Sequence, residues 1–410
     1  MQILALSTYP TDQPSHGGQH RAHNIAKGLR AAGHTVQVAG VLGSGGFPAT
    51  PGFVAYPAAA PLTQASGESR QLEELCIGDL FARDDSYFNS LAALITPTPD
   101  LILVEQPWLM RFARRYADRH PHCKILYSSQ NIEHEMKFDI IRLEQGVTAA
   151  LAAQAKVVQC EVDAIRSADA IACVSVTDHE WISHHASVPC VLAPNGVAQR
   201  SSSQAGIQAA KAISGAQPFA LYCASAHPPN MNGFFDLMGP SIGALAPNQK
   251  IIIAGGAGPS ILQDARSLHV GGLARLCIAA GTVDEVTLQG LLDTAHVIIL
   301  PMSQGGGTNL KTAEALWSGQ HIVATHKAMR GYEDFLQADG LSIADTSSQF
   351  LTALRLAMAR PPHSLSAVER ARRRVLLWDE TLKPLVALVE QMSHSTPGTK
   401  FPAPVMSPTA

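Results

Sequence analysis

Short, almost wholly apolar runs of about five residues recur along this chain, and a longer stretch with helical spacing of apolar residues separates each run from the next. The first run, 3–7, is followed by a helix pattern over 22–29 and then by a second run at 35–39. Strands that are apolar at nearly every position are buried on both faces, which is typical of parallel sheets covered by helices. The alternation therefore predicts βαβ units in a doubly wound α/β sheet.

Two such series are present, and a chain of 410 residues suits two domains of about 150 to 200 residues each. The segment 198–217 is rich in Ser, Ala and Gln and has little to bury, so it is predicted to be an interdomain linker. The domains are then 1–197 and 218–378, and a Pro-, Ser- and Thr-rich tail over 393–410 is predicted to be disordered. The expected strands are 3–7, 35–39, 100–104, 124–127, 168–175, 189–194, 219–223, 250–254, 278–281, 296–300 and 320–324.

Composition excludes several classes of protein. A formal charge of -3 argues against binding nucleic acid through its phosphates. Seven scattered cysteines without metal-ligand spacing indicate reduced thiols in a cytoplasmic protein. No apolar run approaches the roughly 20 residues that span a bilayer, so the chain is expected to be soluble.

The most specific motif is the stretch 301–319, which follows a strand and opens a helix. Glycines at 305–307 let the backbone approach a ligand, and the free N–H groups of a helix start suit a diphosphate. Lys311 lies three residues from both Thr308 and Glu314, so one helix face could present a hydroxyl, a cation and a carboxylate.

This stretch resembles the donor-binding signature of GT4-type retaining glycosyltransferases. The resemblance covers roughly residues 1 to 392 and implies the GT-B fold: two Rossmann-like parallel-sheet domains facing across a cleft. The first domain, completed by a helix at about 379–392, would take the acceptor, and the second would bind a nucleotide diphosphate sugar. Glu314 would bind the ribose hydroxyls, and the residues implied to act on the diphosphate in catalysis are Lys311, Gly306, Gly307 and Thr308. One departure is Gly306, which stands where the family carries a second glutamate facing the donor sugar.

Other motifs carry the same resemblance. The pair Gly17 and Gly18 matches a glycine loop on the acceptor-side domain, and Pro228-Pro229-Asn230 is typical of one GT4 subgroup. Asn230 either contacts the donor or merely caps the next helix. The complete set of implied donor contacts is Gly17, Gly18, Asn230, Gly305, Asn309, Leu310, Glu314 and Arg330.

The segment 128–134 resembles the family segment that often reads His-Asn-x-Glu, with Gln130 where many relatives have histidine. Its side chains either contact the acceptor or belong to a polar loop without function. The acceptor-side candidates are Gln130, Asn131, Glu133 and His134.

Arg111, Arg114 and Arg115 lie on one side of a helix that follows Trp108. They form either a solvated face or a peripheral contact with the inner face of the membrane. The chain has no DxD carboxylate pair, so no metal site and no cofactor besides the nucleotide sugar are expected.

The resemblance implies transfer of a hexose-like sugar to a glycan, lipid-linked or small-molecule acceptor in polysaccharide biosynthesis. Two alternatives remain open: a sugar-nucleotide epimerase of the same fold, and a nucleotide-sugar-binding protein without activity. The donor sugar and its base are not determined by these residues.

Overall fold

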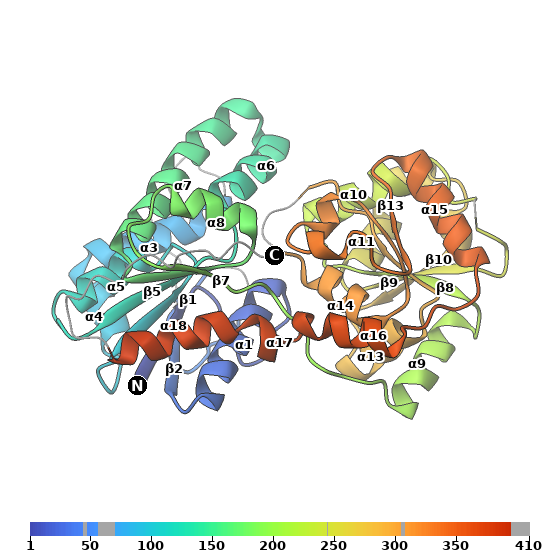
Figure 1. Cartoon of the computed structure of the whole chain (residues 1–410). Coiled ribbons are helices and arrows are strands. Elements are labelled where there is room, and N and C mark those ends of the chain that lie inside the picture. Colours follow the sequence, from blue (N-terminus) through green and yellow to red (C-terminus); the bar gives the residue numbers. More distant parts are fainter. Residues whose placement is uncertain (44–46, 56–69, 244, 305–307, 395–410) are drawn as a thin grey trace. The chain divides into compact units, whose positions relative to one another are not determined.

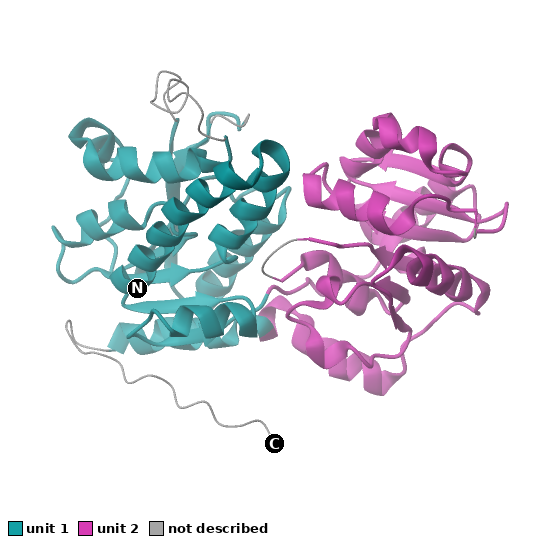
Figure 2. Ribbon diagram, turned by 90° about the horizontal axis from the view of Figure 1, so that it is seen from above, with its two compact units in different colours: residues 1–194, 381–410 teal, residues 195–380 magenta. Residues whose placement is uncertain are grey.

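The computed structural model describes residues 1–43, 47–55, 70–243, 245–304 and 308–394. Two compact units divide the chain: unit 1 is Met1–Pro194 with Thr381–Ala410, and unit 2 is Asn195–Glu380 (Figure 2). Each unit is an α/β domain built on one parallel sheet, as the two series of apolar runs predict.

Unit 1 carries a parallel sheet with the strand order β3-β2-β1-β4-β5-β6-β7 among its described residues. Its strands are β1 (Gln2–Ser7), β2 (Thr35–Leu42), β3 (Phe53–Ala55), β4 (Leu101–Glu105), β5 (Lys124–Ser128), β6 (Ala170–Cys173) and β7 (Cys190–Leu192). Helices cover both faces, with α7 and α8 on one and α1 and α18 on the other (Figure 1). The helices are α1 (Gly17–Ala31), α3 (Glu73–Arg83), α4 (Asp85–Ala92), α5 (Met110–Ala117), α6 (Glu133–Gln145), α7 (Val147–Ser167), α8 (Val176–Ser183) and α18 (Lys383–His394), with the 3-10 turn η1 (Arg70–Leu72).

Unit 2 carries a second parallel sheet with the strand order β10-β9-β8-β11-β12-β13 in the described segments. Its strands are β8 (Phe219–Cys223), β9 (Lys250–Ala254), β10 (Cys277–Gly281), β11 (Val297–Leu300), β12 (His321–Ala324) and β13 (Leu341–Ile343). Its helices are α9 (Gln204–Ser214), α10 (Pro228–Met238), α11 (Ala257–Gln263), α12 (Leu273–Leu276), α13 (Glu285–Thr294), α14 (Leu310–Ser318), α15 (Ser347–Ala359), α16 (Ala367–Arg372) and α17 (Trp378–Thr381), the last ending in unit 1. The 3-10 turns are η2 (Ala265–His269), η3 (Lys327–Met329), η4 (Glu333–Phe335) and η5 (Arg373–Leu376).

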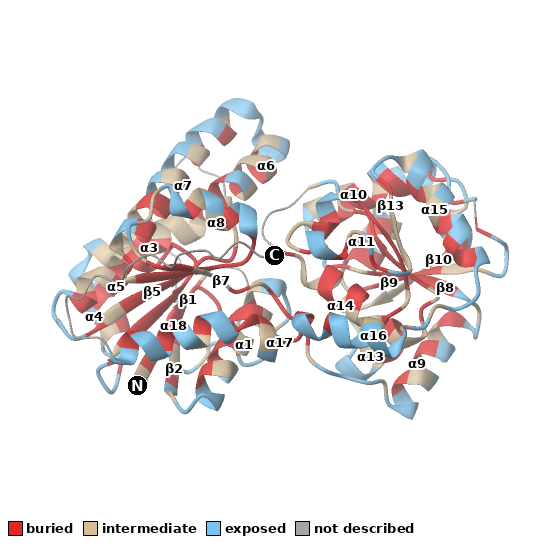
Figure 3. Ribbon diagram, in the orientation of Figure 1, coloured by how far each residue is buried: buried red, intermediate tan, exposed pale blue. Residues whose placement is uncertain are grey.

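Strand β9 shows why the apolar runs are continuous. Ile251 and Ile253 enter the core under α10 and α15, whereas Ile252 and Ala254 enter the core under α9, α13 and α14. Successive side chains of a strand point to opposite faces, so a strand with both faces covered is apolar throughout. Buried residues accordingly follow the strands of both sheets (Figure 3).

The structure differs from the expected linker at 198–217. Residues 204–214 form α9, which Ser203 caps by accepting a hydrogen bond from Gly206 N, and α9 packs on α13. The two helices cross at glycines, since a Cβ on Gly290 would lie 2.0 Å from the carbonyl oxygen of Gly206. Small residues let the two backbones approach, so this Ala-rich helix buries itself without large side chains. The boundary between the units falls at Pro194 and Asn195.

The C-terminal end also differs in detail from the expected tail over 393–410. Helix α18 continues through Ser393 to His394, and residues 395–410 lie outside the described part of the chain. Leu385, Leu388, Val389 and Met392 of α18 are buried, and Lys124 Nζ donates to the carbonyl oxygen of Met392 over 2.6 Å. These contacts hold α18 against the sheet of unit 1.

Candidate functional site

Helix α14 of unit 2 begins directly after the loop that leaves β11. Asn309 is its N-cap, and the Asn309 side-chain oxygen accepts a hydrogen bond from Lys311 N over 3.2 Å. The free N–H groups of the first turn and the helix dipole favour an anion at this end. Thr308 is buried and Leu310 is partly buried, whereas Gly305, Gly306 and Gly307 lie outside the described residues.

Lys311 is held by the loop that opens α10. Its Nζ donates a 2.7 Å hydrogen bond to Asn230 Oδ1, and Asn230 Nδ2 donates to the carbonyl oxygen of Ser225 over 3.0 Å. Tyr222 donates its hydroxyl proton to the carbonyl oxygen of Asn230 over 2.9 Å. Burial lowers the pKa of Lys311 to about 8, against an opposing effect of Glu314. An anion bound beside this ammonium would favour its charged form.

Glu314 lies one helical turn beyond Lys311. Burial raises the pKa of Glu314 to about 7, although the charges of Arg200 and Lys311 act in the opposite direction. A cation and a carboxylate whose pKa values are both displaced toward neutrality mark a candidate functional site with a physical basis.

Asn195 holds Thr308, which lies just before α14. Asn195 N donates to Thr308 Oγ1 over 3.3 Å, and Asn195 Nδ2 donates to the carbonyl oxygen of Thr308 over 2.9 Å. Sequence reasoning missed this contact, because the two residues lie far apart along the chain. A residue 113 positions away along the chain therefore fixes the approach to α14.

The loop after β12 is also fastened to α14. Thr312 donates its hydroxyl proton to the carbonyl oxygen of Ala328 over 2.6 Å, and Thr325 donates likewise to Met302 over 2.6 Å. Arg330 follows in the same loop and is partly buried. His326 instead pairs with Asp345, its Nδ1 lying 2.5 Å from Asp345 Oδ2, and both side chains are exposed.

Asn230 does not cap α10. The N-cap is His227, Pro228 opens the helix, and Asn230 is buried within its first turn. Helix α10 passes close to the end of β11, because a Cβ on Gly233 would lie 2.2 Å from the carbonyl oxygen of Pro301. Asn230 is thus brought to Lys311 by a close helix-to-loop contact and not by capping.

In unit 1, Gly17 and Gly18 start α1, and His16 is the N-cap. A Cβ on Gly18 would lie 2.6 Å from the Tyr9 hydroxyl oxygen and 2.7 Å from Gln130 Oε1. Only glycine fits this approach without displacing one of those side chains. The glycine loop and the segment that starts at Gln130 are therefore brought together within this unit.

Gln130 belongs to a buried network at the carboxyl ends of β1, β4 and β5. Its Oε1 accepts from the Tyr9 hydroxyl over 2.9 Å, and its Nε2 donates to Glu105 Oε2 over 2.9 Å. Burial raises the pKa of Glu105, against the opposing charge of Arg21. Arg21 is buried as well and donates to the carbonyl oxygen of Ala193 over 2.8 Å. Ligands of doubly wound sheets bind near this strand-order switch point.

Glu133 and His134 begin α6, where Glu161 of α7 caps the helix. Glu161 accepts from the backbone N–H groups of Glu133 over 2.7 Å and His134 over 3.0 Å, and its Oε2 lies 2.6 Å from His134 Nδ1. Glu133 is 1% exposed and accepts from Asn131 Nδ2 over 3.3 Å. Burial raises the pKa of Glu133 to about 8, despite the opposing charge of Lys137. Three of the four acceptor-side candidates are thus buried in hydrogen-bonded positions, and only Asn131 is partly exposed.

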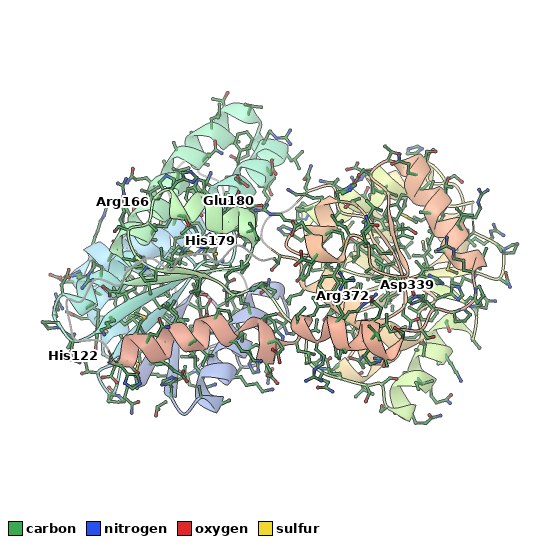
Figure 4. The ribbon with its side chains drawn as sticks, in the orientation of Figure 1. His122, Arg166, His179, Glu180, Asp339 and Arg372 are labelled. Atoms are coloured by element: carbon green, nitrogen blue, oxygen red, sulfur yellow. The ribbon has the colours of Figure 1, made fainter. Side chains whose placement is uncertain are left out.

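The arginines of α5 are paired with aspartates. Arg111 bridges Asp79 and Asp163, Arg114 lies 2.9 Å from Asp118, and Arg115 pairs with Asp85. They line a hollow of about 350 Å³ with Arg166, which lies at the end of α7 (Figure 4). The pairing offsets much of the positive charge that a membrane contact would use.

Within the described residues, no group of three or more His, Cys, Asp or Glu side chains is arranged to hold a metal ion. None of the described helices is both long enough and apolar enough to cross a membrane.

Solved structures similar to the whole chain include sugar-phosphate and starch synthases. Sucrose-phosphate synthase from Thermosynechococcus elongatus has a TM-score of 0.72 at 16% identity, covering 96% of this chain and 99% of that one. This chain has the GT-B fold. The trehalose-phosphate synthase (UDP-forming) of Burkholderia xenovorans, in complex with glucose-6-phosphate, has a TM-score of 0.59 at 14% identity over 96% and 100% of the two chains.

The catalytic domain of starch synthase IV from Arabidopsis thaliana, bound to ADP and acarbose, has a TM-score of 0.58 at 11% identity over 95% and 98%. At these identities the likeness concerns the fold. No protein-family model matches the chain, and no curated protein matches it in sequence.

Proposed function

We propose that this chain is a glycosyltransferase that moves a sugar from a nucleotide diphosphate sugar to an acceptor hydroxyl, with retention at the anomeric carbon. The observation that carries the proposal is the Lys311 and Glu314 pair on one side of α14, next to the free N–H groups of the helix start. The similar solved structures support it, since one is described as UDP-forming and another holds ADP.

The two side chains have different roles in this reaction. Bond cleavage leaves the sugar oxocarbenium-like while negative charge grows on the diphosphate, so Lys311 and the α14 amides stabilise the leaving group. Glu314 accepts hydrogen bonds from the ribose hydroxyls. Asn230 orients the ammonium through its 2.7 Å hydrogen bond, and Asn195 fixes Thr308 at the edge of the diphosphate site. The glycines at 305–307, Asn309, Leu310 and Arg330 complete the proposed donor contacts.

The proposed acceptor is a glycan, a lipid-linked sugar or a small molecule, and Asn131 is its proposed contact. Gly17 and Gly18 are proposed donor contacts. Gln130, Glu133 and His134 act through their hydrogen-bonded network by positioning this loop. All seven cysteines lie in described segments and none forms a disulfide, which supports a reducing, cytoplasmic compartment.

Kinetics of two variants test the proposal. Glu314→Ala should mainly raise the KM for the donor, because the ribose contact is made in both the ground state and the transition state. Lys311→Ala should lower kcat by about tenfold to a thousandfold, as expected for one group that stabilises developing charge. Lys327→Ala, an exposed lysine on η3, is the matched control.

If the chain is a glycosyltransferase, release of the nucleotide from the donor should require an added acceptor. Conversion of the donor to a second nucleotide sugar without acceptor would identify an epimerase. Near-parental kinetics of both folded variants would show that α14 is structural.

A further inference from the structure

A second hollow, of about 670 Å³, lies in unit 2 beside Trp317 of α14. Three of its lining side chains are arginines, one is a tryptophan, and none is a carboxylate. Its lining residues are Gln199, Arg200, Ser201, Trp317, Ala367, Arg370, Ala371 and Arg374. Ligand-binding pockets have volumes of about 300 to 1,000 Å³, so this hollow is of the right size for a small molecule.

The walls of the hollow are fixed to one another. Val197 N donates to the carbonyl oxygen of Leu376 over 2.8 Å, and Trp378 N donates to that of Val197 over 3.0 Å, so the segment before Gln199 is paired with the segment after η5. Ser202 N donates to Asp293 Oδ2 over 2.7 Å, which ties the same segment to α13. The geometry of the hollow is therefore formed before any ligand arrives.

Arg373 joins the remaining wall to α14. It is fully buried and donates to the carbonyl oxygens of Leu316 and Asp339, the latter over 3.0 Å. This anchor holds η5 beside the last turn of α14. Neighbouring Arg372 and Asp339 are labelled in Figure 4, which shows this region of unit 2.

The three arginines that line the hollow differ in their ion pairs. Arg200 pairs with Glu285 of α13. Arg370 and Arg374 lie one helical turn apart, are exposed, and have no hydrogen bond or ion pair from their side chains among the described residues. Exposed guanidinium groups in a fixed concave site match the geometry of phosphate oxygens. Trp317 is partly buried beside them and offers a flat apolar face.

We propose that this hollow is a second ligand site, which takes a phosphorylated compound carrying a ring: the phosphate lies between Arg370 and Arg374, and the ring lies on Trp317. Sugar phosphates and nucleoside monophosphates share this chemistry. An indole stacks with a nucleobase or with the apolar face of a sugar ring. Occupation of the site needs none of the residues proposed to contact the donor.

Calorimetric titration of the full chain with inorganic phosphate, glucose 6-phosphate and AMP tests the site. At least one ring-bearing probe should bind more tightly than phosphate. The variant Arg370→Gln/Arg374→Gln should weaken that binding by about tenfold or more, the usual value of hydrogen bonds to charged groups. Trp317→Leu should reduce the difference in affinity between the ring-bearing probe and inorganic phosphate. Arg355→Gln, at an exposed residue of α15, is the matched control and should bind as the parent does.

Three results would overturn the site: no binding of any probe, binding unaffected by the double variant, or equal affinity for phosphate and both ring-bearing probes. Lys311→Ala separates this inference from the proposed function. It should lower donor turnover by about tenfold to a thousandfold and leave probe binding intact. Loss of probe binding in Lys311→Ala would show that only one anion site exists.

Discussion

Donor affinity should pass through a maximum between about pH 7 and pH 8, because the two groups that flank the start of α14 titrate at its two limits. Lys311 has a pKa of about 8, so above that value the free protein loses the ammonium that a diphosphate needs. Glu314 has a pKa of about 7, so below that value it loses the carboxylate that accepts from the ribose. Binding should therefore take up a proton above pH 8 and release one below pH 7.

The size of the change in donor affinity follows from the ionised fractions of Lys311 and Glu314. At about pH 9 only roughly one tenth of Lys311 is charged, so affinity should fall about tenfold from its maximum, or about 1.4 kcal/mol. At about pH 6 roughly one tenth of Glu314 is ionised, so donor affinity should again fall about tenfold from its maximum. The ligand should be a nucleotide diphosphate sugar, whose phosphates are both esterified and do not titrate in this range.

Calorimetry in two buffers of different ionisation enthalpy measures both the affinity and the proton count. Lys311→Arg should remove the alkaline limb, since guanidinium remains charged throughout, and Glu314→Gln should remove the acid limb. Lys327→Gln should keep both limbs. An affinity that is flat from about pH 6 to pH 9, or limbs that persist in the matching variants, would refute the assignment of these groups.

Three further results are expected. Glu133→Gln should raise the free energy of unfolding by up to about 5 kcal/mol above pH 8 and by nothing below pH 4.5, because a buried acid with a raised pKa destabilises the fold progressively between those limits. Chemical unfolding at both pH values checks this, and an equal gain at both would contradict it. Gly290→Ala should lower the free energy of unfolding by about 1–3 kcal/mol, because the added methyl group overpacks the crossing of α9 and α13. Gly28→Ala, whose Cβ would lie 3.6 Å from Leu382, is the control and should be neutral or stabilising. Thermal unfolding measures both variants. Transfer should proceed at an undiminished rate in EDTA, since Lys311 and the α14 amides supply the positive charge; loss of activity with rescue by Mg²⁺ or Mn²⁺ would rule this out.

The sequence predicted the two sheets well because their central strands are buried on both faces and read as continuous apolar runs. It missed β3 and β13, since each is a three-residue edge strand with intermediate or exposed side chains. It also missed α9, whose close packing depends on Gly206 and Gly290 and not on large apolar residues. Composition alone does not reveal such a crossing.

The start of α14 and its lysine and glutamate could be predicted from local spacing. The partners of these residues could not, because Asn195 and Thr308 meet over 113 positions and Gln130 and Tyr9 over 121. The buried state of Glu133 and His134 was hidden for the same reason, since Glu161 lies on the next helix. Such contacts depend on tertiary packing.

The pairing of Val197 with Leu377 places the two ends of unit 2 side by side, so one domain is inserted into the chain of another. During synthesis, all of unit 2 precedes α18. The surface of unit 1 that receives α18, including Lys124 and Gly28, must stay uncovered until about 190 further residues have been added, at roughly 5 to 20 residues per second. Unit 2 can fold first, and its two adjoining ends then bring α18 to unit 1. At the slower of these rates, unit 1 will have been without α18 for tens of seconds.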